Sequence, residues 1–389
     1  MTSSTTVTTA RWILTVSGPP IYRGWIRTDG QQILEVGSGK PPSAAVDLGD
    51  VAILPQWVNA HTHLEFSDLQ KPIGEAGIAL WDWIGQVVEA RKGSNADRKA
   101  KAISAGIAES AAAKVCLVGE ISTLPCEYPK SDQAVEWVAF AETIGLSPSR
   151  SAERFATASE YVAHVQNAAV SPHAPYSSTP ELIDRSIQLA TRYGCPVAMH
   201  VAESPAEREL LCTGSGPFAD RLKAMGVWQQ GVFPWGGEPF EELIHRLAKA
   251  PRSLLVHGND LRSNELDKIA RHSNMTVVYC PRTHAFFGYT PHPVAELLRR
   301  GVPVALGTDS RASNPDLDLG GEVRYLLEHR QDIDPADVLR MATLHGANAL
   351  GRKDLGRIEV GCLAKLAVVE STTTEADEVI PSSLIGHRR

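Results

Sequence analysis

Two histidines separated by one residue are the most direct sign of chemistry in this 389-residue chain. His61 and His63 follow an apolar run at residues 51–58 that we expect to form a strand. Side chains two apart on a strand point to the same face, so both imidazoles could reach one metal ion. Taken alone, a His-X-His pair is equally compatible with two surface histidines. The pair therefore needs support from the rest of the chain.

Further polar residues directly follow other short apolar runs of the sequence. They are His173, His200, Glu203, His257 and Asp309. A single histidine in such a place is more often a hydrogen-bonded structural residue. So many at the same end of different strands are hard to assemble by chance. Imidazole and carboxylate groups with an open coordination position are typical of a catalytic rather than a structural zinc site.

The elements that must position these residues alternate between strand and helix from residue 51 onward. We expect strands at residues 51–58, 115–120, 135–141, 168–171, 196–201, 253–256, 276–279 and 302–306. Strands that alternate with helices favour right-handed crossovers and a parallel sheet. Eight such units predict an α/β fold that closes into a (β/α)8 barrel of the TIM type. Active sites of these barrels lie at the C-terminal ends of the strands, where the polar residues fall.

Both ends of the chain have a different pattern from the middle. Residues 1–50 and the segment around 356–370 combine short strands with turns, including an Asp29-Gly30 hairpin signal. We expect residues 1–50 and 355–389 to form a small flanking β-sandwich domain, and residues 51–354 to form the barrel. The irregular stretch 214–239 is a candidate lid or binding loop.

The composition of the chain argues against nucleic acid and membranes as binding partners. The net charge of −7, without a basic run, gives no electrostatic footprint for nucleic acid or an anionic membrane. No stretch approaches the roughly 20 apolar residues that span a bilayer, and no secretory signal pattern opens the chain. The six cysteines are scattered, which argues against a disulfide scaffold or a thiolate zinc site. We expect a cytoplasmic protein that binds a small-molecule substrate, with a homo-oligomer left open.

Taken in order, these motifs resemble the amidohydrolase superfamily over nearly the whole chain. They are Asn-Ala-His-Thr-His at 59–63, Ser-Pro-His-Ala-Pro-Tyr-Ser at 171–177, His-Val-Ala-Glu at 200–203, the histidine at 257 and Gly-Thr-Asp-Ser at 307–310. The resemblance is narrowest to the branch of cytosine and guanine deaminases, adenosylhomocysteine deaminases and triazine chlorohydrolases. Residues 63–67 and 80–84, with Arg91, are similar to aminodeoxyfutalosine deaminases.

The resemblance implies a role for each residue. His61, His63, His200 and Asp309 match the metal ligands of the family. Glu203 matches the glutamate that shuttles protons in its deaminases, His257 the histidine that orients or deprotonates the reacting water, and His173 a substrate contact. Asp309 could also accept a proton from that water.

The same resemblance implies a single metal ion. Binuclear members of the superfamily use a carboxylated lysine after the fourth strand, and residues 171–176 offer none. Three histidines and an aspartate suit one divalent ion, for which zinc is the first expectation and iron or manganese are alternatives. A zinc ion lowers the pKa of its water from 15.7 to about 7, which makes hydroxide available at neutral pH.

Three further residues are candidates for substrate binding, each with a plainer alternative. Glu65 is expected on the same face as His61 and His63, where it could bind a base edge or simply fix a loop. Trp83 could supply a stacking face or cover the rim of the core. Arg282, or alternatively Arg311, could hold a carboxylate or phosphate by paired hydrogen bonds.

The sequence therefore predicts a metal-dependent aminohydrolase that releases ammonia from an amino-substituted purine- or pyrimidine-like ring. Glu203 favours deamination because that reaction needs a proton at nitrogen. An adenine nucleoside derivative such as aminodeoxyfutalosine is one candidate substrate. Chloride loss from a triazine, or hydrolysis of another C–N bond, would use the same site. An inactive barrel that serves as a binding protein is the alternative from a different class, but such proteins typically lose metal ligands.

Overall fold

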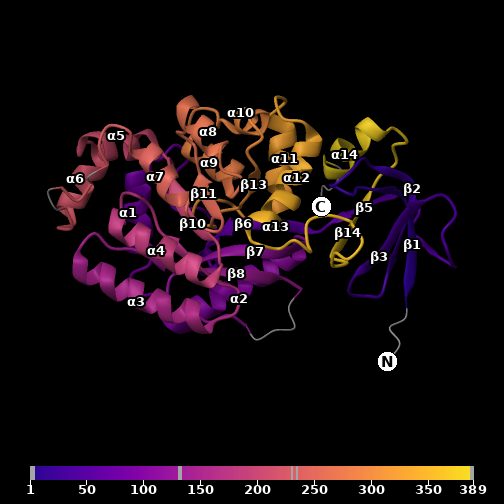
Figure 1. Cartoon of the computed structure of the whole chain (residues 1–389), viewed down its shortest axis with the longest axis horizontal. Helices are drawn as coiled ribbons and strands as arrows, with labels where there is room; N and C mark the ends of the chain where they lie inside the picture. The colour runs from indigo at the N-terminus through magenta and orange to yellow at the C-terminus, as the bar shows by residue number, and fades with distance from the viewer. Residues whose placement is uncertain (1–4, 130–133, 229–230, 234, 386–389) are drawn as a thin grey trace.

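The computed structural model describes residues 5–129, 134–228, 231–233 and 235–385. Its strands form two separate sheets, one of eight strands and one of six. Figure 1 shows the larger sheet surrounded by helices, with the smaller sheet beside it. Strands β1 (Thr6–Ile13) and β14 (Leu366–Glu370), from opposite parts of the chain, both belong to the smaller sheet. No helix among the described residues has the length and hydropathy needed to cross a membrane.

The eight-stranded sheet is parallel throughout and follows the order of the sequence. Its strands are β6 (Trp57–Thr62), β7 (Val115–Ser122), β8 (Glu136–Thr143), β9 (Ala168–Pro172), β10 (Val197–Val201), β11 (Ser253–His257), β12 (Met275–Tyr279) and β13 (Val304–Leu306). The first and last strands meet, because the backbone N–H groups of Thr308 and Asp309 both donate to His61 O at 3.1 Å. The predicted barrel is confirmed.

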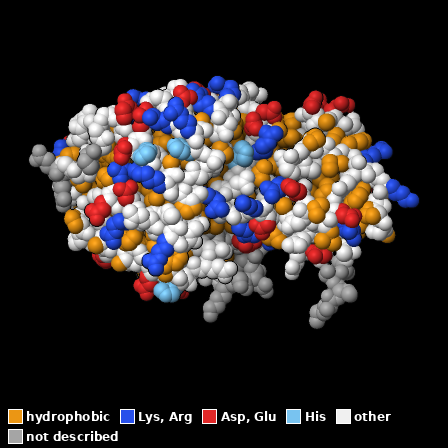
Figure 2. Space-filling model, in the orientation of Figure 1, with side chains coloured by type: hydrophobic (Ala, Val, Ile, Leu, Met, Phe, Trp, Pro, Cys, Tyr) orange, Lys and Arg blue, Asp and Glu red, His pale blue; other side chains and the backbone are white. Residues whose placement is uncertain are grey.

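Helices cover the outside of this barrel. They are α1 (Leu80–Ala90), α2 (Ala96–Ala112), α3 (Pro148–His164), α4 (Pro180–Tyr193), α5 (Pro205–Thr213), α6 (Pro217–Ala224), α7 (Pro239–Leu247), α8 (Ser263–Ile269), α9 (Pro281–Phe287), α10 (Val294–Arg299), α11 (Leu319–His329), α12 (Pro335–Met341) and α13 (Leu344–Ala349). On the face drawn in Figure 2, acidic and basic side chains lie interspersed over the barrel. This mixture fits the many ion pairs between its helices.

Helix α4 illustrates how local sequence sets these boundaries. The Thr179 hydroxyl caps the helix by accepting a hydrogen bond from the Leu182 N–H at 3.2 Å, and Pro180 occupies the first turn. Gly194 ends the helix in the left-handed conformation, with φ of 68°. The apolar stripe that includes Ile183 and Ile187 is buried in the core. The helix packs against β9, the strand that leads to His173.

The smaller sheet has the strand order β14-β5-β1-β2-β3, and β4 pairs with β1. Its other strands are β2 (Ile21–Thr28), β3 (Ile33–Ser38), β4 (Val46–Asp47) and β5 (Val51–Pro55). The predicted turn is present: the Asp29 carboxylate accepts the N–H groups of Gln31 and Gln32, and Gly30 has φ of 91°. Strands from both ends of the chain therefore share one sheet, as the sequence predicted.

The flanking β domain is confirmed, and its described strands lie in one sheet rather than in the two layers of a sandwich. One face, with Trp12, Leu54 and Val369, joins the main core next to the barrel. The other face packs against Ile358 and Cys362 from the segment that precedes β14. A second sheet is not needed, since the barrel and this segment cover both faces.

The predicted strand at residues 51–58 is also two strands. β5 belongs to the small sheet, where it pairs with β1 and β14, and β6 begins the barrel at Trp57. The sheets thus divide after Pro55 rather than at residue 51. Pro55 and Gln56 mark this division in the sequence, but the apolar residues on either side have the composition of buried strands in either sheet.

One segment expected to be irregular, and the tail assigned to the flanking β domain, contain helices. Helix α6 lies within residues 214–239, and the tail forms α14 (Ala376–Ile385). Helix α14 packs against α11 and α12 of the barrel and buries Val379 in the main core. The end of the chain therefore contacts the barrel as well as the small sheet.

Candidate active site

Three histidines meet at the C-terminal end of the barrel. His61 lies in β6, His63 follows that strand, and His200 lies in β10. One nitrogen from each ring belongs to a group of atoms that all lie within 4.8 Å of one another. Asp309, which follows β13, places Oδ1 3.5 Å from His61 Nε2 and 3.6 Å from His63 Nε2. The four predicted ligands therefore converge.

The junction between β6 and β13 brings His61 and Asp309 together. Asn59 Nδ2 donates to Thr308 Oγ1 at 2.7 Å, and Asn59 Oδ1 accepts the Thr308 N–H at 3.1 Å. Gly307 allows the close approach, because a Cβ there would lie 2.9 Å from both the Cβ and the carbonyl oxygen of His61. The glycine of the Gly-Thr-Asp-Ser motif is thus explained by packing against the first strand.

Neighbouring groups orient the ligands. His200 Nδ1 donates to the carbonyl oxygen of His173 at 2.8 Å, which leaves Nε2 with a free electron pair. Asp309 Oδ2 accepts a hydrogen bond from Ser313 Oγ at 2.8 Å, while Oδ1 faces the histidines. His200 and Asp309 are therefore each fixed by a second contact that leaves one atom directed at the centre.

The donor set fits one divalent metal ion. Both ring nitrogens of His61 are buried and have no hydrogen-bond partner within the described part of the chain, which is costly unless another ligand binds them. Burial is the main cause that lowers the pKa of His61 to about 3 and the pKa values of His63 and His200 well below 6.5. These imidazoles are neutral at pH 7, the form that binds metals.

Glu203 and His257 lie next to this cluster as an interacting pair. Glu203 Oε1 is 3.5 Å from His257 Nε2, and both side chains are buried. Burial raises the pKa of Glu203 well above its usual value, and the negative charges of Asp309 and Glu207 add to the shift. A carboxyl group with a raised pKa can both accept and donate a proton near neutral pH.

The backbone at these strand ends is strained. Ala202, His257 and Asp309 have φ values of 51°, 71° and 54°, in the left-handed region that residues with a Cβ rarely adopt. Strained residues tend to cluster at functional sites, where surrounding contacts hold them in place. The three positions lie at the ends of β10, β11 and β13, so strained backbone is present at three of the strand ends around the cluster.

His173 lies beside the cluster, as predicted for a substrate contact. Its ring centroid is 4.9 Å from that of His200, and its Nδ1 is 2.7 Å from Ser177 Oγ. Glu142, at the end of β8, places Oε1 4.0 Å from His173 Nε2. Sequence reasoning missed Glu142, although it follows an apolar run just as His173 does.

Glu65 does not continue the strand on which its predicted position depended. β6 ends at Thr62, and Glu65 lies in the short 3-10 helix η1 (Leu64–Phe66). Its carboxylate pairs with Arg91 and accepts a hydrogen bond from Thr123 Oγ1 at 3.0 Å. These contacts support the alternative in which Glu65 fixes a loop, although burial raises the pKa of its carboxyl.

Trp83 lies within an apolar cluster of α1, α5, α6 and α9. Its indole packs edge-on against Phe287, with ring centroids 5.4 Å apart, and Nε1 donates to Ala312 O at 3.1 Å. Covering the rim of the core, the plainer of the two predicted roles, agrees with these contacts.

Arg282 is not available to a substrate anion. Its Nε donates to Glu322 Oε1 and its Nη2 to Asp316 Oδ1, both at 2.7 Å, and Nη2 also contacts Asp318 O. The prediction for Arg282 is therefore wrong, because acidic residues of the same chain already occupy its guanidinium. Arg311 is likewise held by Glu109 through two hydrogen bonds.

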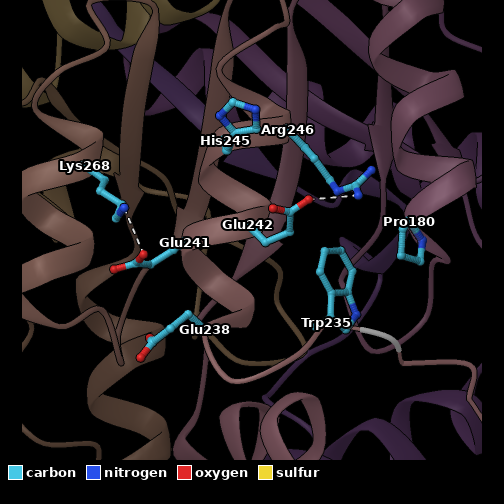
Figure 3. Close-up of a pocket in the computed structure, with 8 residues that line it drawn as sticks. All are labelled: Pro180, Trp235, Glu238, Glu241, Glu242, His245, Arg246 and Lys268. Atoms are coloured by element: carbon cyan, nitrogen blue, oxygen red, sulfur yellow. Dashed lines mark ion pairs between the residues drawn. The ribbon is translucent and has the colours of Figure 1, made fainter.

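An open groove on the outside of the barrel is separate from this centre. It lies between α7, α8 and the start of α4 (Figure 3). Glu241 pairs with Lys268 and Glu242 with Arg246, each at 2.9 Å. Its acidic and basic groups largely neutralise one another. The buried atoms that lack a partner among the described residues, Trp235 Nε1 and Arg246 Nε, are single N–H donors rather than a converging set of metal-binding atoms.

Comparison with known proteins places the chain in a family. The model of the amidohydrolase family matches residues 52–383, which include the whole histidine cluster. The chain belongs to the amidohydrolase family. Members of this family depend on metal ions, in agreement with the donor set described above.

Individual relatives extend this result. A 5-methylthioadenosine/S-adenosylhomocysteine deaminase from Nitratidesulfovibrio vulgaris is 29% identical over 93% of this chain and 80% of its own length. An aminodeoxyfutalosine deaminase from Deinococcus radiodurans is 27% identical over 80% of this chain and 76% of its own. The crystal structure of Helicobacter pylori aminofutalosine deaminase with methylthio-coformycin has a TM-score of 0.85 and 23% identity, covering 99% and 97% of the two chains. The predicted resemblance to deaminases of this family is confirmed.

Proposed function

We propose that this chain is a metal-dependent deaminase that hydrolyses the exocyclic amino group of a purine- or pyrimidine-like ring, with adenine nucleoside derivatives as the first candidates. The observation that carries the proposal is the Glu203–His257 pair beside the ligand cluster, at 3.5 Å. Deamination needs a group that carries a proton to a ring nitrogen, and a buried carboxyl with a raised pKa suits that task.

His61, His63, His200 and Asp309 would hold one metal ion, with zinc preferred and iron or manganese as alternatives. When bound, a zinc ion acts as a Lewis acid and lowers the pKa of water to about 7. The neutral state of the histidines, which burial favours, supports this assignment. Asp309 Oδ1 is also available to accept a proton from the attacking water.

Glu203 moves the proton in this scheme. Its carboxylate takes a proton from the attacking water and delivers it to the ring nitrogen next to the carbon under attack. His257 Nε2 donates a hydrogen bond that stabilises the attacking oxygen. The proton left on the attacking oxygen then passes by way of Asp309 to the amino group. The C–N bond breaks, a C=O bond forms, and the amino group leaves as ammonia.

The substrate class rests on the relatives and on the residues that border the cluster. The relatives named as deaminases of methylthioadenosine, adenosylhomocysteine and aminodeoxyfutalosine support an adenine nucleoside with a substituted ribose. His173 and the carboxylate of Glu142 border one side of the cluster, where they can accept hydrogen bonds from a base or a sugar.

Ammonia release from a panel of nucleosides tests the proposal. The panel contains adenosine, methylthioadenosine, adenosylhomocysteine, aminodeoxyfutalosine, guanine and cytosine, offered to zinc-loaded protein. We expect turnover of one adenine nucleoside, reduced about 100- to 10,000-fold in Glu203→Gln with metal content unchanged. Full activity of Glu203→Gln would contradict the role of Glu203. Chloride release from a triazine without ammonia release from the panel would favour the chlorohydrolase alternative.

A further inference from the structure

The two residues at the turn that carries Glu203 have every backbone polar group bonded. Glu207 Oε1 accepts the Ala202 N–H at 3.1 Å, and Glu207 Oε2 accepts the Glu203 N–H at 2.7 Å. The loop after β11 bonds the carbonyl oxygens: the Asp260 N–H donates to Ala202 O at 2.8 Å, and Asn259 Nδ2 donates to Glu203 O at 3.0 Å. The turn is thus held from both sides.

This turn would not keep its shape unaided. Ala202 has φ of 51°, and a Cβ makes that left-handed conformation unfavourable. Relaxation of Ala202 toward an extended conformation would continue β10 and rotate Glu203 away from His257. The four hydrogen bonds therefore select the one backbone conformation that keeps the Glu203 carboxylate beside the ligand cluster.

Burial of the Glu207 carboxylate at this position is unfavourable in free energy. Its side chain is completely buried on the first turn of α5, and within the described residues no basic group pairs with it. The adjacent Arg208 is instead committed to Asp260 and Glu265. Both oxygens of this buried carboxylate accept hydrogen bonds from main-chain N–H groups. Its burial lowers stability, which suggests that the backbone geometry it fixes serves function.

We propose that Glu207, assisted by Asn259, is a positioning residue for catalysis: its carboxylate holds the Ala202–Glu203 turn so that Glu203 reaches the reacting atoms. The inference rests on the proposed role of Glu203. Glu207 itself touches neither the metal ligands nor the substrate, and it acts only through the backbone of residues 202 and 203.

A double-mutant cycle tests this inference on the full-length, metal-loaded protein. Glu207→Gln turns one of the two acceptors into a donor that faces an N–H group. We expect kcat for ammonia release to fall about 100-fold, with KM, metal content and the folded fraction little changed. Glu209→Gln is the matched control, since it removes the same charge from an exposed position on the same helix. It is expected to leave kcat unchanged.

The cycle separates positioning from general damage. If Glu207 acts through Glu203, adding Glu207→Gln to Glu203→Gln lowers kcat little further. Losses that multiply would overturn the inference. Should Glu207→Gln fail to fold, Asn259→Ala, which removes only the bond to Glu203 O, decides by the same cycle. Normal activity of Glu203→Gln would instead refute the proposed function, so the two failures are distinguishable.

Discussion

Two groups of polar residues lie at neighbouring strand ends, and the comparison between them shows how a ligand site differs from a structural ion pair. After β12, Arg282 donates from Nε to Glu322 and from Nη2 to Asp316, so acidic residues of the same chain neutralise its charge. At the ends of β6 and β13, His61 has two buried nitrogens without a partner in the described residues, close to Asp309 Oδ1. The sequence pattern is the same in both places. The convergence of His63, His200 and Asp309 on those unpaired nitrogens is what marks the second group as a ligand site.

Replacing Arg282 tests whether its ion pairs serve stability rather than metal binding. Arg282→Gln leaves Glu322 fully buried without its cation, so we expect a loss of about 3–5 kcal/mol in the free energy of unfolding. Metal content should not change. Urea unfolding measures the loss, and Arg300→Gln, which breaks surface ion pairs, should cost less than about 1 kcal/mol. Loss of metal from folded Arg282→Gln would show that the two groups are coupled.

The pH dependence of stability in the metal-free protein tests the assignment of His61 as a buried, neutral ligand. Burial lowers the pKa of His61 to about 3, so the folded state binds this proton less readily than the unfolded state. The resulting stability is present above pH 6.5 and is lost as pH falls toward 3. Between pH 6.5 and 5 we expect His61 alone to cost roughly 2 kcal/mol. Urea midpoints at both pH values measure it. The same slope in His61→Asn would contradict the assignment.

Much of the fold could be predicted because its signals are local. Apolar runs with a polar residue at the end indicated the eight strands and the positions of His61, His200 and Asp309, and the barrel geometry required these ends to meet. The division between β5 and β6 was missed although Pro55 and Gln56 interrupt residues 51–58, and the pairing of β5 with β14 is what assigns the first part to the small sheet.

The remaining errors concern long-range contacts. The sequence places Arg282 and Glu65 next to the site but cannot show that Glu322 and Arg91 already bind them. Glu207 was missed for the same reason, since its partners are backbone N–H groups that no motif records. A side-chain role that depends on a contact distant in sequence can be assigned only from the folded structure.

Activity measured against added metal tests the central claim most directly. Metal-free protein is titrated with zinc, and ammonia release from the preferred adenine nucleoside is followed. We expect activity to rise linearly with added zinc and to reach a plateau at one equivalent per chain. We also expect that His61→Asn neither binds the ion nor gains activity. A break at two equivalents, or full activity without metal, would contradict a single-ion site built from His61, His63, His200 and Asp309.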